Sequence, residues 1–399
     1  MLNYEEIITQ RSESLFATDM RANHDVLCER ISGSRVAIVG AAGSIGSSVV
    51  KTILHYHPRA LSLIDLNENN LVEIVRDLRS SDKVELPNHF TTLPIGFGTI
   101  EFDRYFQDSE PFDYFLNLCA VKHVRSEKNI YCLMRMVDTN AIFLKSFLAQ
   151  NPYRFENVFS VSSDKATNPA NLMGATKMVM EKILLDYSVQ QPFSTARFAN
   201  VAFSDGSLPY GFLQRISKRQ PISAPKDVKR YFISHQEAGE LCTLSCFLGE
   251  NRDVFFPRLS DYKDERTFAR IAIELLEALG YEAIEYDTEE EAKRRFSECI
   301  SQKRWPCYFS KTDTSGEKDF EEFYEAGEEI DINRFRAIGV IKRFGLSDPE
   351  IHSLRQFVEF CMGAKRDVSV KKQDYVKAML RVVPSLQHVE KGKNLDQKM

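Results

Sequence analysis

Three consecutive side chains near the middle of the chain could exchange protons with a bound molecule. Ser163 carries a hydroxyl, Asp164 a carboxylate and Lys165 an ammonium, and they end an apolar, β-branched run that begins at Val158. Such a run is typical of a buried strand in a parallel sheet. Because ligands of open α/β sheets bind outside the carboxyl ends of the strands, we expect an acid–base cluster there. The alternative interpretation is a surface turn with an Asp–Lys pair and an N-cap.

A glycine-rich segment near the amino terminus could hold a pyrophosphate. An apolar run over residues 35–39 precedes Gly40, Gly43 and Gly46, and a helical pattern follows to His55. A side chain at Gly40 or Gly43 would block the tight turn and keep the backbone off the anion, and Gly46 lets the helix pack on the strand. The free N–H groups of the helix face the anion. A turn without ligand is the alternative. The predicted cofactor contacts of this loop are Gly40, Gly43, Ser44, Ile45 and Gly46.

A carboxylate ends the next apolar run. Asp65 follows residues 60–64, about where an acidic side chain binds the ribose 2′-hydroxyl of an adenosine. A 2′-phosphate would meet like charge there, which favours NAD over NADP as the cofactor. Asp65 could also be an N-cap of the following helix, and the two roles are compatible. Asn67 and Ala120 are predicted as further cofactor contacts.

The elements that must position these groups alternate regularly. Strand and helix patterns follow one another over residues 35–200, which indicates a doubly wound, Rossmann-like parallel sheet. We predict an amino-terminal helical arm over 1–30, a cofactor-binding domain over 31–205, and a smaller, mixed and mainly helical region for substrate and oligomer contacts over 206–399. Amphipathic patterns place helices in this last region at 264–279 and, after a capping box at Ser347, up to Gly363.

Composition excludes several classes of protein. The chain has 399 residues, 43% of them hydrophobic, and a formal net charge of −5, which argues against nucleic acid as the main partner. No apolar run is long enough for a membrane span, and the amino terminus lacks the apolar core of a signal peptide. The eight cysteines contain no Cys-x-x-Cys pair. We therefore expect a reduced, cytoplasmic protein without a cysteine-based zinc site or other bound metal.

Together these residues resemble the extended short-chain dehydrogenase/reductase family, and within it the nucleotide-sugar 4,6-dehydratases of polysaccharide biosynthesis. The Asp-Lys-Ala-x-Asn-Pro run from Asp164 to Pro169 is the most specific part, and it is similar to UDP-N-acetylglucosamine 4,6-dehydratases rather than to epimerases. The resemblance covers about residues 35–240. The matching segments are Gly40–Gly46, Ala120–Val124, Val161–Pro169, Met173–Lys177, Arg197–Val201 and Arg230–Phe232.

The resemblance implies a reaction and a role for each site residue. NAD would take a hydride from C4 of a UDP-sugar and return it to C6. A neutral Lys165 would remove the C5 proton, a protonated Asp164 would release the 6-hydroxyl as water, and Ser163 would bind the C4 oxygen. Lys177 would bind the nicotinamide ribose and lower nearby pKa values. The predicted substrate contacts are Lys122, His123, Met173, Asn200 and Arg230. The family also implies a homo-oligomer.

Several residues depart from the family pattern or allow plainer roles. Met173 occupies the position of the usual catalytic tyrosine, and a thioether cannot act as a base. Lys122 and His123 could instead be a solvated lysine and a structural histidine, and Arg230 a surface ion pair. Two other functions therefore stay open: a nucleotide-sugar C4 epimerase, and a non-catalytic sensor that binds NAD. Three further departures are Phe97 for aspartate, Arg125 for proline and Phe203 for glycine.

Overall fold

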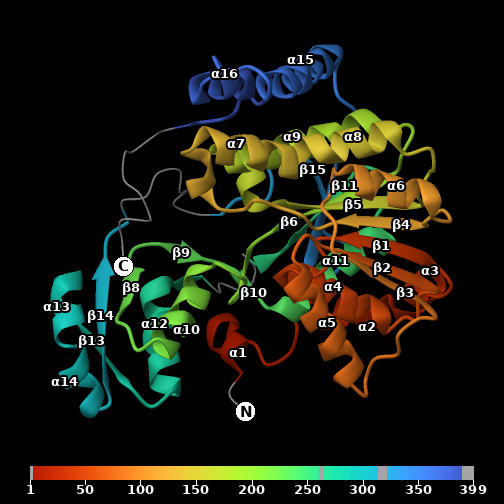
Figure 1. Ribbon diagram of the computed structural model, residues 1–399. Helices are drawn as coiled ribbons and strands as arrows, with labels where there is room; N and C mark the ends of the chain where they lie inside the picture. Colours follow the sequence, from red (N-terminus) through yellow and green to blue (C-terminus); the bar gives the residue numbers. More distant parts are fainter. Residues whose placement is uncertain (1–2, 260–264, 313–320, 389–399) are drawn as a thin grey trace.

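A nine-stranded sheet organises the computed structural model, which describes residues 3–259, 265–312 and 321–388 (Figure 1). Seven strands are parallel, in the order β3-β2-β1-β4-β5-β6-β11, and β16 and β15 extend this sheet antiparallel beyond β11. The predicted doubly wound fold is confirmed. In chain order the strands are β1 (Arg35–Val39), β2 (Ala60–Ile64), β3 (His89–Leu93), β4 (Tyr114–Asn117), β5 (Asn157–Ser163), β6 (Phe193–Phe198), β11 (Asp253–Pro257), β15 (Glu329–Asp331) and β16 (Ile338–Lys342).

Helices cover both faces of this sheet because its central strands are apolar on both sides. Buried side chains form one core cluster on each face. One face carries α3 (His24–Ile31), α4 (Ser44–Leu54), α5 (Glu68–Ser80) and α11 (His235–Leu248). The other carries α6 (Ile100–Asp108), α7 (Ile130–Val137), α8 (Phe143–Gln150) and α9 (Leu172–Tyr187), and a π-helical turn over Asp138–Ile142 joins α7 to α8.

A further helical layer lies over α9. Helices α15 (Asp348–Ala364) and α16 (Lys372–Val382) form the outermost layer at the top of Figure 1. Their buried side chains belong to the same core cluster as those of α9. The predicted capping box is present, because Ser347 and Glu350 satisfy each other's backbone N–H groups. None of the helices in the described ranges has the length and apolar character needed to cross a membrane.

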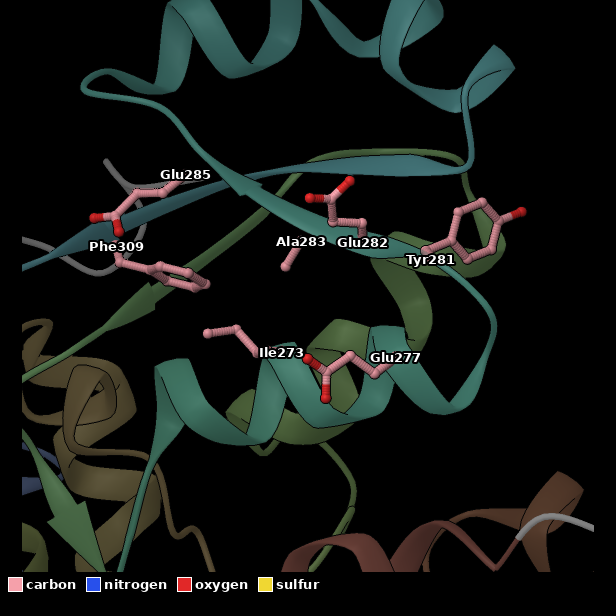
Figure 2. A pocket seen from close by; sticks show the side chains of 7 residues that line it. All are labelled: Ile273, Glu277, Tyr281, Glu282, Ala283, Glu285 and Phe309. Carbon is pink, nitrogen blue, oxygen red and sulfur yellow. The ribbon is translucent and has the colours of Figure 1, made fainter.

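A smaller lobe lies beside the carboxyl edge of the sheet. Its core joins α1 (Tyr4–Thr9), α10 (Leu208–Ser217) and α12 (Phe268–Ala278) to a three-stranded sheet. That sheet has the order β13-β14-β8, from Glu282–Glu285, Arg304–Ser310 and Ile222–Pro225, with α13 (Glu289–Arg294) and α14 (Phe296–Ser301) beside it. A hollow of about 430 Å³ on this lobe is lined by Ile273, Glu277, Tyr281, Glu282, Ala283, Glu285 and Phe309 (Figure 2).

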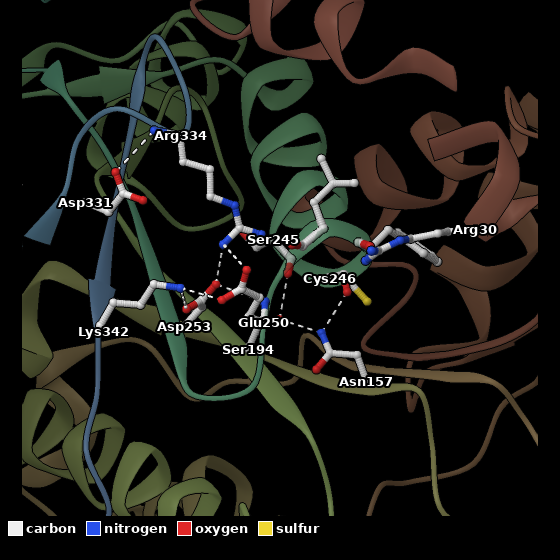
Figure 3. Close-up of polar contacts among 12 residues, drawn as sticks. Arg30, Asn157, Ser194, Ser245, Cys246, Glu250, Asp253, Asp331, Arg334 and Lys342 are labelled. Atoms are coloured by element: carbon white, nitrogen blue, oxygen red, sulfur yellow. Dashed lines mark hydrogen bonds and ion pairs between the residues drawn. The ribbon is translucent and has the colours of Figure 1, made fainter. Parts of the chain in front are cut away.

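The chain returns to the main sheet after forming most of the lobe, so the predicted boundary at residue 205 does not coincide with the sheet's edge. Asp253 at the start of β11 is fully buried and receives hydrogen bonds from Arg334 (2.6 Å) and Lys342 (2.8 Å) (Figure 3). These contacts attach the antiparallel edge to the parallel strands. The predicted helical arm comprises α1, α2 (Ala17–Ala22) and α3, and it packs on its own chain.

Candidate active site

Ser163, Asp164 and Lys165 form one hydrogen-bonded cluster at the carboxyl end of β5. The chain leaves the strand in a short 3₁₀ turn over Asp164–Ala166. Ser163 Oγ donates to Asp164 Oδ1 at 2.7 Å, and Lys165 Nζ donates to both carboxylate oxygens, at 3.0 and 3.1 Å. Ser163 Oγ also accepts from the Lys165 backbone N–H at 3.1 Å. The hydroxyl therefore links the turn to the carboxylate, which is 5% exposed.

The charge state of Lys165 differs from the one the resemblance implied. Burial lowers the pKa of its ammonium, but the negative charges of Asp164 and Glu321 outweigh burial and raise the pKa above its usual value. The neutral amine required for a general base is thus disfavoured in this arrangement. The hydrogen bonds from Lys165 Nζ to both oxygens of Asp164 likewise favour the ammonium form of Lys165.

The glycine loop forms an open cradle between β1 and α4. Gly40 has a φ of +75°, and a Cβ there would lie 2.8 Å from backbone atoms of Leu118 and Cys119. A Cβ on Gly46 would lie 2.1 Å from the Gly40 carbonyl, so this glycine allows the helix to approach the loop. Gly43 differs from its prediction. Its φ is −77°, and the nearest atom to an added Cβ would be 3.5 Å away, so the turn does not require glycine there. Its missing side chain leaves space above the loop instead.

Other predicted cofactor residues surround this cradle. Asp65 follows β2, and its carboxylate accepts from the backbone N–H groups of Ala42 (3.1 Å) and Asn67 (2.9 Å). Asn67, not Asp65, is the N-cap of α5. Ser44 begins α4, and its hydroxyl accepts from the Asp205 backbone N–H at 2.9 Å, which joins the cradle to the loop after β7 (Asn200–Val201). Ile45 is half-buried behind the loop, and Ala120 is exposed in the segment that follows β4.

Helix α9 brings two predicted residues behind the cluster. Lys177 is 4% exposed, and its Nζ donates to the carbonyl of Val161 in β5 at 2.9 Å. Burial lowers the pKa of this ammonium to about 8. Met173 is buried in the apolar core of that face. Gly174 was not singled out in the sequence, yet a Cβ there would lie 2.1 Å from the Lys165 carbonyl.

Lys122 and His123 lie together in the segment after β4. Asn140, in the π-helical turn, holds this segment through Val121, accepting from its N–H at 2.8 Å and donating to its carbonyl at 3.1 Å. Lys122 Nζ donates to Ser204 Oγ at 3.3 Å. Burial lowers the pKa values of both Lys122 and His123. The ring of His123 faces Gly206, where an added Cβ would lie 2.7 Å from Nε2.

A carboxylate from far along the chain completes the polar surroundings of the cluster. Glu321 accepts hydrogen bonds from the Asn200 side chain and from the Tyr231 backbone N–H, the latter at 2.8 Å. Arg230, in β9 (Lys229–Arg230), is 7% exposed and interacts electrostatically with both Lys165 and Glu321. The structure thus gathers Asn200 and Arg230 around Glu321. Sequence reasoning missed Glu321, because no motif surrounds it.

The chain matches the model of the family described as polysaccharide biosynthesis protein over residues 36–297. It belongs to this family. The resemblance to enzymes of polysaccharide biosynthesis, which was predicted from the sequence, is thereby confirmed.

Proteins similar to this chain include some that are named as nucleotide-sugar enzymes. The chain is 28% identical to an uncharacterized membrane protein of Methanocaldococcus jannaschii, over 62% of this chain and 73% of that one. It is 27% identical to the probable polysaccharide biosynthesis protein EpsC of Bacillus subtilis, over 64% of this chain but only 42% of the relative. A UDP-N-acetylglucosamine 4,6-dehydratase (inverting) of Campylobacter jejuni is 25% identical, over 58% of this chain and 69% of that one.

Solved structures share the fold. Pen from Bacillus thuringiensis aligns with a TM-score of 0.60 at 20% identity, covering 82% of this chain and 98% of Pen. DesIV, a dTDP-glucose 4,6-dehydratase from Streptomyces venezuelae with NAD and TYD bound, aligns with a TM-score of 0.55 at 14% identity, covering 82% of this chain and 97% of DesIV. At these identities the likeness extends to the architecture, with the same mostly parallel sheet and its flanking helices.

Proposed function

We propose that this protein catalyses the NAD-dependent 4,6-dehydration of a UDP-amino sugar, with UDP-N-acetylglucosamine as the first candidate, for surface glycan biosynthesis. One observation carries the proposal: the hydrogen-bonded cluster of Ser163, Asp164 and Lys165 at the sheet edge. A carboxylate and an ammonium beside a hydroxyl suit the elimination of water, which needs a proton donor and a proton acceptor. The relatives named as 4,6-dehydratases support the same reaction class.

NAD fits the cradle because space is open above Gly43, the α4 amino terminus lies beside it, and Asp65 stands at the end of β2. When bound, NAD would accept a hydride from C4 of the sugar and give it back at C6. The residues proposed to hold it are Gly40, Gly43, Ser44, Ile45, Gly46, Asp65, Asn67, Ala120 and Lys177. The buried ammonium of Lys177 would donate to the hydroxyls of the nicotinamide ribose.

The hydrogen bond between Ser163 and Asp164 supplies a proton path that does not need a tyrosine. Met173 has no acidic proton, so the C4 hydroxyl must lose its proton to another group. In our proposal the C4 hydroxyl donates to Ser163 Oγ, which passes its own proton to Asp164 over the 2.7 Å hydrogen bond. Asp164 is then a carboxylic acid, which can donate that proton to the 6-hydroxyl as it leaves as water.

The remaining predicted residues would bind the substrate. Lys122, His123 and Arg230 bring positive charge or hydrogen-bond donors to the same edge, which suits a diphosphate and sugar hydroxyls. Met173 would contact an apolar part of the sugar, and Asn200 would act through its contact with Glu321. As in the family generally, we expect the working enzyme to be a homo-oligomer.

A turnover assay read by mass spectrometry tests the proposal. Incubation with UDP-N-acetylglucosamine and NAD should give a product lighter by one water, without net NADH formation. Asp164→Asn should lower the rate about 100-fold or more, because general acid–base groups contribute roughly that much. Asp82→Asn, on an exposed loop, is the matched control and should leave the rate unchanged.

Other outcomes identify the competing functions. A product of unchanged mass but altered C4 configuration would make the protein an epimerase, the activity named for other relatives. Tight NAD binding with no turnover across a panel of UDP- and dTDP-sugars would make it a sensor. Either result would end the dehydratase proposal.

A further inference from the structure

Glu321 occupies a place in the active site that no known role accounts for. It lies in the segment that leads into β15, yet its carboxylate reaches the residues after β6 and β9. We propose that the Glu321 carboxylate is the base that removes the C5 proton of the sugar and later returns a proton to that carbon. This inference rests on the proposed dehydratase function and assigns one step of it.

Buried contacts hold the segment over the site. Arg197 in β6 is fully buried and donates to the Phe323 carbonyl at 2.8 Å and to Glu328 at 3.2 Å. The same guanidinium donates to Glu181 of α9 at 2.8 and 3.1 Å. The ring of Phe323 stacks on Phe256 of β11, with centroids 6.0 Å apart. These contacts fix the chain at Phe323, two residues after Glu321, against β6 and β11, and so limit where the Glu321 carboxylate can lie.

The hydrogen bonds of Glu321 leave it able to accept a proton. One carboxylate oxygen accepts from Asn200 Nδ2 and the other from the Tyr231 N–H. Within the described residues each oxygen accepts one hydrogen bond, and since each has two lone pairs, each can accept another. Both partners are donors, which orients the carboxylate and stabilises its ionised form.

Burial, together with the charges that face Glu321, places the pKa of its carboxyl group near neutrality. Burial raises the pKa of Glu321 to about 7, the charge of Asp164 also raises it, and Lys165 and Arg230 lower it. A base whose pKa lies near the working pH is ionised often enough to act and still basic enough to take a proton. Lys165, held as an ammonium by Asp164 and Glu321, does not compete for this role.

With Glu321 as the base at C5, each proton that moves in the proposed reaction has a donor and an acceptor. The C4 hydroxyl proton reaches Asp164 through Ser163 and leaves with the 6-hydroxyl as water. Glu321 takes the C5 proton while the electrons of that C–H bond form the C5–C6 double bond that expels the hydroxyl. Glu321 would then give a proton back to C5, once C6 has received the hydride that bound cofactor would supply. The ammonium of Lys165 keeps its proton throughout and stabilises the negative charge that develops on the C4 oxygen.

Glu321→Gln separates this step from the rest of the reaction. With NAD and UDP-N-acetylglucosamine in D₂O, the wild-type protein should place deuterium at C5 of the product, because the proton taken up by Glu321 exchanges with solvent before a proton is returned to C5. The variant should still oxidise C4 in a single turnover, so reduced nicotinamide accumulates, while C5 exchange and loss of water fall about 100-fold or more. The wild-type dehydration rate should rise with pH through about 7 as Glu321 ionises, and this rise should be absent in Glu321→Gln.

Two further variants guard against a purely structural effect. Glu321→Asp keeps a carboxylate and should recover part of the C5 exchange. Glu322→Gln removes the neighbouring charge, which contacts Asn168 at 3.5 Å, and should leave the exchange within about twofold of wild type. Normal dehydration and C5 exchange by Glu321→Gln, with wild-type dehydration intact, would overturn this assignment alone. Absence of dehydration by the wild-type protein would overturn the proposed function instead.

Discussion

Asp65 connects the two ends of the cofactor cradle through its two carboxylate oxygens. One accepts from Ala42 in the glycine loop and the other from Asn67 at the start of α5. Both oxygens keep a free lone pair, so the carboxylate can still accept from a ribose hydroxyl. A 2′-phosphate at the same place would face a fixed negative charge, which costs several kcal/mol near a protein surface, about 4 kcal/mol at 4 Å.

Asp65→Ser should therefore change cofactor preference. The wild-type protein should bind NAD more tightly than NADP, and the variant should reduce this ratio by about tenfold or more, because the repulsion is removed. Dissociation constants for both cofactors, measured by isothermal titration calorimetry, check the ratio. Asp65→Ser also removes the hydrogen bond from the Ala42 N–H. This loss should weaken the binding of NAD and NADP equally, so it does not change the ratio of their dissociation constants. Asp77→Ser, on the exposed face of α5, is the control, and an unchanged ratio in Asp65→Ser would contradict the assignment.

At the scale of single residues, sequence reasoning identified the local motifs and missed the distant partner. Ser163, Asp164 and Lys165 are adjacent in the chain, so their clustering follows from one strand end. Glu321 joins them only because β15 and β16 return to the sheet. The charge of Lys165 was misjudged for the same reason, since it depends on two carboxylates and only Asp164 is a neighbour in sequence.

At the scale of elements, α9 links the layers of the molecule. All residues from Leu172 to Leu185 are buried, because the sheet covers one side and α15 and α16 cover the other. Its amino terminus reaches the Lys165 turn, where Gly174 leaves no room for a side chain. The position of the Asp164–Ala166 turn thus depends on how closely α9 can approach it.

Gly174→Ala tests this close approach. The new methyl group would overlap the Lys165 carbonyl, and overpacking of this kind costs about 1–3 kcal/mol. We expect a lower midpoint of urea unfolding and a reduced rate of the proposed dehydration, because the Asp164–Ala166 turn must move. Gly211→Ala in α10 is the matched control: nothing lies within 4 Å of its added Cβ, so it should stabilise by about 0.5–1 kcal/mol. Equal effects of the two substitutions would contradict the close-contact argument.

Elements were predicted well where a local pattern exists. The strands at 35–39, 60–64 and 193–198 agree with the structure, since each is a short apolar run between turns. The helix expected at 264–279 is observed as α12, from Phe268 to Ala278, and residues 260–264 lie outside the described part. The three-stranded sheet of the lobe was not predicted, because its strands pair across long insertions.

At the scale of the whole molecule, α1 joins the lobe to the sheet domain. Ile8 is buried in the core of the lobe. Arg11, just after the helix, forms an ion pair with Glu237 of α11 at 2.8 Å, and Glu5 bonds His235 at the start of the same helix. Contacts to both sides make separate unfolding of lobe and sheet unfavourable. Sequence alone could not place this arm, since its partners lie more than two hundred residues away.

Phe357→Ala tests whether the lobe and the sheet domain unfold together. Phe357 lies in α15, in the outer helical layer over α9. Its side chain is 2% exposed, so its truncation should cost about 3–5 kcal/mol. The single tryptophan, Trp305, is buried in the lobe, so its fluorescence reports unfolding there, whereas circular dichroism reports the whole chain. We expect the urea midpoints of both signals to fall together, because the lobe and sheet are tied through α1. Val368→Ala, at a site 94% exposed, should change neither midpoint. A fall in the dichroism midpoint with an unchanged fluorescence midpoint would show that the lobe unfolds independently.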